Sequence, residues 1–464
     1  MSRLAQAAEG LRDGVRHHGT FFRRVSADVL RIAGAVGLAQ ALVFAASPLL
    51  TRLYDPAAFG HFTILGAIVT ILTPLASLRY GWALPLPKDE ETALDLLALC
   101  LVVTVAVPVL VGLVGTLAWV LTQGWGALHA VDILLLAAAL LIVGLNEVVT
   151  SWLIRNQSFP QVAGQRFVTL LGTAVCQLAV ATVKPDADGL MIGFIGGYAL
   201  GLIRAAGQCR TDLERSVRGM TVRRLRRVAA EYRQFALLTA PSGVVNGVGR
   251  QLPNLVLPPL YGLAMAGQLS LAHRVLWQPT ALLGQAANQV LWGNAARLRT
   301  EDPRRLWLLF LAFNAGLFAL MTPGLILTAY GEEIFGVVFG AGWEEAGRYA
   351  GIVVLSSIVG VAAQATSCLH LYGLNRWMSA WEVGRLLTIA GAMLAVWWLD
   401  LPALGAVIAM TAAFALSDAA LLGLNTIAVW RIRHLEEGRL KEGRPGRVQS
   451  PPEQPSTIAP RSPG

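Results

Sequence analysis

Two long apolar stretches, separated by an arginine-rich block at residues 208–230, constrain this chain more than any other feature. The block contains seven arginines against only Asp212 and Glu214. A guanidinium at the centre of a bilayer costs about 2.5 kcal/mol or more, so the block must lie in water at a membrane surface. Because cytoplasmic loops carry the excess of Lys and Arg, we expect that surface to be the cytoplasmic one.

The composition agrees with a membrane protein. The chain of 464 residues is 55% hydrophobic and 14% charged, whereas a soluble domain carries about 25% charged residues. The net charge of +9 could indicate nucleic acid, but the excess lies in the block, the loops and the tails, where membrane orientation requires it. We therefore expect membrane lipids rather than nucleic acid as partners. Three of the four cysteines lie in apolar stretches and Cys209 lies in the block, which predicts no extracytoplasmic disulfide.

The lengths of the apolar segments predict an all-α polytopic membrane protein. A span needs about 20 largely apolar residues. Six candidates precede the block and six follow it: 29–51, 59–84, 94–121, 131–153, 163–183, 189–207, 233–259, 263–292, 305–329, 345–371, 377–399 and 402–430. The predicted domains are an N-terminal tail (1–28), a six-helix bundle (29–207), the basic linker (208–230), a second six-helix bundle (231–432) and a disordered tail (433–464).

The loops are consistent with this count. With the linker inside, the outer loops at 53–58, 122–130, 184–189, 261–267 and 331–345 are nearly free of basic residues, apart from Lys184 and the flanking Arg52. The inner loops carry Arg79, Lys88 and Arg155 in the first bundle, and further arginines in the second. This asymmetry predicts that both termini are cytoplasmic.

An internal repeat relates the two bundles. Under a shift of 207 residues, Leu50, Leu53, Tyr54, Ala57, Gly60, Thr73 and Leu75 meet Leu257, Leu260, Tyr261, Ala264, Gly267, Thr280 and Leu282. The shared core, Leu-Tyr-x-x-Ala-x-x-Gly, forms the predicted outer turn between the first two helices of each bundle. Since each bundle has an even number of spans, the repeat is predicted to be parallel, with its axis along the membrane normal.

Polar residues inside the spans indicate where a substrate would bind. In the seventh span, Ser242, Asn246, Arg250 and Asn254 recur every four residues and share one helix face. In the eighth, Arg274, Gln278, Gln285 and Asn288 also share a face. Two arginine-bearing stripes on consecutive helices predict a positively charged, water-filled cavity; the alternative is snorkelling arginines or hydrogen bonds between helices.

Glu147, Glu382 and Asp418 are the candidate acids within the spans. Glu382 precedes Arg385 by three residues, which favours an intrahelical pair. Asp418 and Glu147 are candidates for ion coupling, and Asp418 has no evident partner in the sequence. Asp186-x-Asp188 has the spacing of a metal site, but its setting is typical of a turn and a helix cap. Glycines four residues apart in the sixth span predict close helix packing.

Three stretches resemble the polysaccharide transporter, or oligosaccharide flippase, family of the superfamily that includes the MATE drug exporters. They are Ser47–Gly60 (SPLLTRLYDPAAFG), Arg79–Pro87 (RYGWALPLP) and Tyr232–Arg299. The resemblance extends over both bundles but not over the tails. Similar proteins often carry an acid after the Arg-Tyr pair, whereas this chain has Gly81.

The resemblance implies two bundles around a central cavity and no catalytic chemistry or cofactor. The implied function is to move polyprenyl-pyrophosphate-linked oligosaccharide from the inner to the outer leaflet of the bacterial inner membrane, for O-antigen or exopolysaccharide synthesis. Glycosyltransferases or a polymerase would be partners. Arg250, Arg274, Asn246, Asn254, Gln278 and Arg79 are the predicted substrate-binding residues. The alternatives are a MATE-type small-molecule antiporter and a flippase for the peptidoglycan lipid precursor.

The linker provides the test of topology. A cysteine introduced within residues 208–230 of the chain should not react with a membrane-impermeant thiol reagent added outside intact cells. A cysteine in the predicted outer loop at 122–130 serves as the control and should react. Ready labelling of the linker from outside would overturn the predicted orientation.

Overall fold

The structure, a computed structural model, describes residues 37–122, 129–277, 302–367 and 374–441, together with positions 34, 284, 288, 291, 298 and 369. The described part is almost entirely helical and contains no strand. The predicted tail 1–28 and the last part of the predicted tail 433–464 lie outside it.

Each of the twelve predicted spans contains a helix in the described residues. The first half consists of Gly37–Leu53, α2 (Pro56–Ala76), a 3-10 turn (Tyr80–Ala83), α3 (Glu90–Leu121), α4 (Ala130–Arg155), α5 (Phe159–Ala181) and α6 (Ala187–Gln208). The second half begins with a π-helical turn, Phe235–Thr239, and α9 (Ala240–Tyr261), and a helix follows within 263–277. It continues with α11 (Pro303–Met321), a 3-10 turn (Thr322–Leu325), α12 (Ile326–Phe339), a 3-10 turn (Ala341–Trp343), α13 (Glu344–Ala365), α14 (Asn375–Trp398) and α15 (Ala403–Lys441). In the described part, eight helical segments are long and apolar enough to cross a membrane.

Three segments differ from the prediction. The linker is helical, as α7 (Arg210–Arg218) and α8 (Val222–Glu231). The predicted outer loop at 331–345 begins as helix, because Gly331 is not a turn residue here: a Cβ on it would lie 2.3 Å from the carbonyl oxygen of Gly347, so the glycine lets α12 approach α13. The predicted disordered tail is wrong up to Lys441, where α15 ends, because this stretch consists largely of helix formers and the first proline comes later.

Local signals in the sequence account for several helix ends and contacts. The Asp55 side chain accepts a hydrogen bond from the Ala58 N–H at 2.7 Å and starts α2. Asp186 caps α6 in the same way through Gly189, at 2.9 Å, which confirms the cap interpretation of this aspartate pair. The glycines of α6 pack on α5, as predicted: a Cβ on Gly197 would lie 2.2 Å from the Thr173 nitrogen.

The repeat places equivalent residues against one another. A Cβ built on Gly60 would lie 1.8 Å from the carbonyl oxygen of Leu263, and one built on Gly267 would lie 1.8 Å from that of Pro56. Gly267 and Leu263 are the repeat equivalents of Gly60 and Pro56, so the two contacts are one contact made twice around a pseudo-two-fold axis. This is the parallel relation between halves that the sequence predicted.

Among the described residues, the largest core that both halves build lies at one end. A continuous cluster there includes Leu50 and Tyr54 from the first half and Phe339 and Trp343 from the second. The Trp343 indole donates to the Thr51 carbonyl at 2.8 Å. At the other end, the cluster around Trp152 consists mainly of the first half and the linker, with Tyr232, Phe235 and Ala236 from the start of the second half packed against it, and the clusters around Phe310 and Trp381 belong to the second half.

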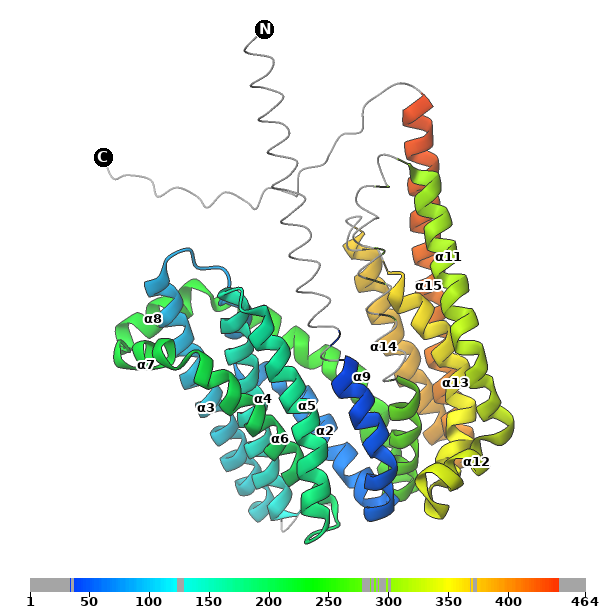
Figure 1. Cartoon of the computed structure of the whole chain (residues 1–464), viewed down its shortest axis with the longest axis horizontal. Coiled ribbons are helices and arrows are strands. Elements are labelled where there is room, and N and C mark those ends of the chain that lie inside the picture. Colours follow the sequence, from blue (N-terminus) through cyan, green and yellow to red (C-terminus); the bar gives the residue numbers. More distant parts are fainter. Residues whose placement is uncertain are drawn as a thin grey trace.

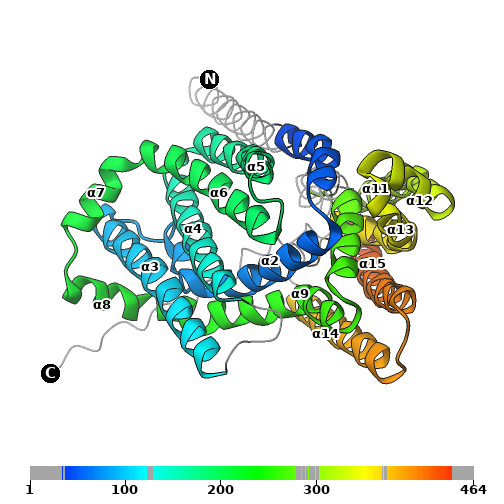
Figure 2. The same cartoon turned by 90° about the horizontal axis from the view of Figure 1, so that it is seen from below.

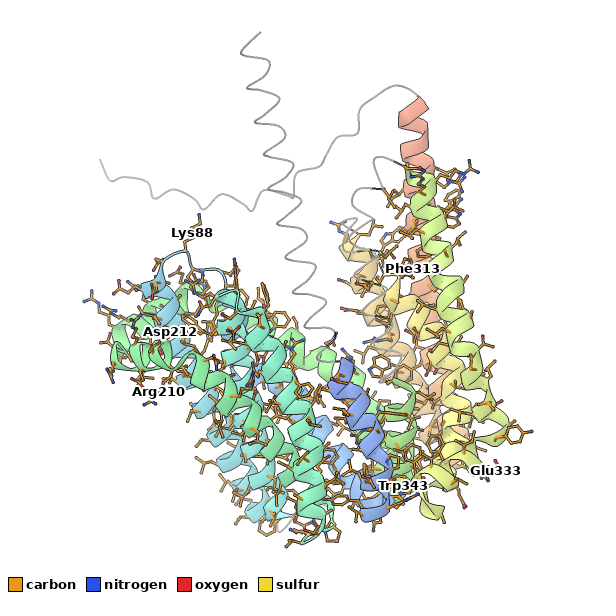
Figure 3. The ribbon with its side chains drawn as sticks, in the orientation of Figure 1. Lys88, Arg210, Asp212, Phe313, Glu333 and Trp343 are labelled. Atoms are coloured by element: carbon orange, nitrogen blue, oxygen red, sulfur yellow. The ribbon has the colours of Figure 1, made fainter. Side chains whose placement is uncertain are left out.

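The figures show the same asymmetry. The halves meet at the end where Trp343 lies and diverge towards the end where Lys88 and α8 lie (Figures 1 and 3). α9 is the exception, since it follows α2 towards the divergent end (Figure 2). We call the two ends the closed end and the divergent end.

The crossing at Gly60 provides a stability test. Gly60→Ala should lower the apparent free energy of unfolding by about 1–3 kcal/mol or more, because the added methyl overlaps a backbone carbonyl. Gly66→Ala on the same helix is the matched control, since a Cβ there has nothing within 4 Å. Thermal unfolding in detergent measures both variants. Equal stability of the two would show that the glycine contact is not tight.

Candidate functional site

The first cluster of charged residues lies where α2 ends. Leu78 and Arg79 have positive φ values of 46° and 57°, and a 3-10 turn follows. This reversal places Arg79 against α4, where its Nη1 donates to Oε1 of Glu147 at 2.8 Å. The Trp82 indole donates to the same oxygen at 2.9 Å, and the guanidinium carbon lies 4.2 Å from the centroid of that ring. We call these residues the first-half cluster.

The ion pair of this cluster is largely shielded. The side chains of Arg79 and Glu147 are 17% and 20% exposed. Nε of Arg79 and Oε2 of Glu147 are buried without a hydrogen-bond partner among the described residues. Because an unpaired charge would be costly here, each side chain compensates the other. Although Gly81 replaces the acid common in similar proteins, Glu147 supplies a carboxylate from another helix.

The first-half cluster also contacts the second half of the molecule. A Cβ built on Gly243 of α9 would lie 3.3 Å from Nη2 of Arg79 and 2.9 Å from the Pro74 side chain. The predicted roles of Arg79 in substrate binding and of Glu147 in ion coupling therefore concern one structural unit. Both roles stay predictions.

A second cluster surrounds Asp418 on α15. Gln364 of α13 donates to its Oδ1 at 3.4 Å, and a Cβ on Gly360 would lie 2.7 Å from Oδ2, so the carboxylate lies against α13. Arg385 of α14 is close enough for its charge to interact with those of Asp418 and of Arg250 on α9. Asp418 thus has the partners that the sequence did not reveal. Its role in ion coupling stays a prediction.

The predicted pair of Glu382 with Arg385 is not a direct ion pair, although the charge of Glu382 acts on Arg385. Glu382 is exposed and forms no ion pair with Arg385, although the structure describes both side chains. Instead, the guanidinium of Arg385 stacks on Trp381, 4.8 Å from the ring centroid. The Trp381 indole in turn donates to the Ser417 carbonyl at 2.7 Å, and this hydrogen bond holds α14 against α15.

The predicted stripe on α9 is only partly buried. Asn246 and Arg250 are exposed, whereas Asn254 is half-buried and donates to Oε1 of Gln251 at 2.7 Å. Arg250 makes no hydrogen bond or ion pair with any described residue. Its side chain therefore remains available to a ligand in this structure.

The eighth predicted span carries the second stripe. Arg274 is half-buried and, within the described ranges, makes no hydrogen bond or ion pair. Asn288 donates to the Ala365 carbonyl at 2.9 Å, so it serves helix packing. Gln278 lies outside the described residues, and no described contact joins Arg274 to Arg250.

The arrangement favours binding over catalysis. Uncompensated guanidinium groups in helices of membrane length bind anions, above all phosphate groups, through charge-assisted hydrogen bonds. Among the described residues, no group of three metal-ligating side chains occurs. The sequence indicated no site role for Arg385, Gln364 or Trp82. Gln364 and Trp82 contact acids that are distant in the chain, Asp418 and Glu147.

Comparison with known families gives one match. A family model described as polysaccharide biosynthesis protein matches residues 49–348. No curated protein matches the sequence.

Several solved structures share the fold. The lipid II flippase MurJ in an inward closed conformation has a TM-score of 0.63 at 12% identity, covering 88% of this chain and 91% of that chain. A MOP superfamily transporter from Pyrococcus furiosus has a TM-score of 0.54 at 13% identity, covering 88% and 96%. An inward-facing multidrug resistance MATE family transporter has a TM-score of 0.53 at 12% identity, with the same coverage. The chain is similar to all three in fold.

The first-half cluster can be tested by a double-mutant cycle. Arg79→Gln and Glu147→Gln should each destabilise the protein, and the double variant should cost less than the sum of the two. We expect a coupling of about 1–3 kcal/mol, because each single change leaves the other charge uncompensated. Thermal unfolding of the four proteins measures it. Simple additivity would show that the pair is not a structural unit.

Proposed function

Because the chain belongs to the polysaccharide biosynthesis protein family, we propose that it is a flippase for polyprenyl-pyrophosphate-linked oligosaccharide. It moves these units from the inner to the outer leaflet of the bacterial inner membrane, for O-antigen or exopolysaccharide synthesis. Both termini and the α7–α8 linker lie in the cytoplasm. Glycosyltransferases that build the oligosaccharide and a polymerase that consumes it are its partners in this proposal.

The observation that carries this proposal is that Arg250 and Arg274 have no acidic partner among the described residues. Arg250 lies in α9 and Arg274 in the helix described within 263–277. Such cations are retained in membrane spans mainly where they serve a ligand or a pathway. A pyrophosphate offers the anionic oxygens that two guanidinium groups bind best, while the lipid tail stays in the bilayer.

The difference between the closed end and the divergent end supports a mechanism of alternating access. With the linker in the cytoplasm, the divergent end faces the leaflet in which lipid-linked oligosaccharides are made. The closed end then separates this site from the outside. Rocking of one half against the other would open the closed end and release the headgroup outward. Outward movement of an anion is also electrically downhill, by about 2.3 kcal/mol per charge per 100 mV.

A complementation assay tests the two arginines. In a host that lacks its own copy, Arg250→Ala and Arg274→Ala should each abolish surface polysaccharide, because the headgroup loses a cation. Arg→Lys at either position should retain part of the output, since the charge remains but the bidentate geometry is lost.

The control is Arg210→Ala on α7, a surface arginine paired with Glu214 at 2.8 Å, which should export normally. Immunoblotting and size-exclusion profiles must show equal insertion of all variants. Wild-type output from the Arg250→Ala, Arg274→Ala double variant would show that these arginines are not the headgroup site.

A further inference from the structure

A groove runs between α14 and α15 in the second half. Its volume is about 520 Å³, and it is formed largely by Trp377, Ala380 and Gly384 of α14 and by Leu416, Ala420 and Leu424 of α15. The two helices lie side by side and α9 passes next to α14 (Figure 2). The small residues leave the helix backbones open to a long, thin ligand.

The groove is apolar except at one place. Arg385 is the one ionisable residue in its lining, where Thr388 and Ser417 supply hydroxyl groups. Asp418 and Glu382 lie near enough for their charges to act on Arg385, but the Asp418 carboxylate lies against α13 and neither acid lines the groove. Hydrocarbon walls with a single guanidinium fit an amphiphile that has an anionic head and an apolar chain.

The position of Arg385 connects the groove to the proposed headgroup site. A Cβ on Gly249 of α9 would lie 3.0 Å from Cδ1 of Leu386, so α9 touches α14 beside Arg385. Arg250 lies one residue further along α9, and its charge acts on Arg385. Two guanidinium groups on facing helices suit a diphosphate better than the single phosphate of a phospholipid. This charge complementarity favours the transported lipid over a bilayer lipid.

We propose that the α14–α15 groove holds the isoprenoid segment next to the diphosphate of the transported lipid, with the diphosphate between Arg385 and Arg250. The inference rests on the proposed function and adds the site of the lipid chain to it. Transfer of the chain from bilayer to groove gains no hydrophobic free energy, since both surroundings are apolar. Recognition therefore depends on van der Waals packing in the groove, and filling the groove must abolish it.

Two glycines of α14 provide a matched pair of variants. Gly384 lines the groove, whereas Gly391 lies two turns further along the same helix and outside the lining. Both glycines are exposed and a Cβ at either position has nothing within 4 Å, so a side chain can start there without overlapping the protein. Gly384→Leu fills the groove and Gly391→Leu does not. Ala420→Leu fills the groove from the other helix if Gly384→Leu proves unstable.

The experiment is photolabelling of the full-length protein in lipid nanodiscs. The probe is a polyprenyl diphosphate with a benzophenone on the isoprene next to the diphosphate, and labelled peptides are mapped by mass spectrometry. We expect labels in α14 and α15 of the wild type and of Gly391→Leu, and at least tenfold less in Gly384→Leu. Unlabelled polyprenyl diphosphate should compete, and phosphatidylglycerol at the same mole fraction should not.

The outcomes separate the two proposals. Equal labelling of the wild type and Gly384→Leu, or equal competition by phosphatidylglycerol, overturns the groove assignment. Labels confined to other helices such as α9 also overturn it while leaving the proposed function in place. No specific labelling anywhere in the wild type would contradict the proposed function itself.

Discussion

The structure depends on a contact between backbones at the closed end. Gly60 and Gly267 each meet a carbonyl group of the other half, at a distance that no side chain could occupy. In a membrane, helices associate through packing and hydrogen bonds rather than through the hydrophobic effect, so such close approach determines where the halves can join. The shared core around Trp343 and Tyr54 surrounds this contact. In the proposed rocking motion, this contact acts as the joint between the two halves.

The two halves differ in how their arginines are compensated, and this difference suits an anionic cargo. The first-half cluster compensates Arg79 with Glu147. On α9, by contrast, Arg250 is exposed and close to a second guanidinium, Arg385. The charges of Asp418 and Glu382 act on Arg385, whereas Arg250 has no ion pair with a described residue, and such a cation is costly inside a membrane unless a ligand supplies the anion. The headgroup and groove proposals place the diphosphate and the lipid chain of one ligand at neighbouring positions.

The sequence predicted those features that depend on local or periodic patterns. The lengths of the apolar segments predicted twelve spans, each of which contains a helix in the described residues. The shift of 207 residues related Gly60 to Gly267. The Asp186 cap and the glycines of α6 followed from neighbours along the chain. The fold class and the family resemblance are confirmed by the family match and by the shared fold.

The features that the sequence did not predict depend on residues far apart in the chain. The pair of Arg79 with Glu147 spans 68 positions, and that of Gln364 with Asp418 spans 54. Gly331 was predicted to lie in an outer loop between two apolar spans, whereas here it serves a helix contact. The groove has no sequence signal, since Ala380, Gly384 and Ala420 become neighbours only when α14 packs on α15.

The central claim is that the closed end opens when the divergent end closes around cargo. Distances between spin labels, measured by double electron–electron resonance in nanodiscs on a chain without its own cysteines, test it most directly. One label pair joins Lys88 to Arg304 at the start of α11, and the other joins Val183, between α5 and α6, to Glu333. Lys88 and Glu333 mark the divergent and the closed end in Figure 3. Addition of lipid-linked oligosaccharide should shorten the first distance and lengthen the second. If both distances stay unchanged while the same protein transports its cargo, the closed end does not open and the account is contradicted.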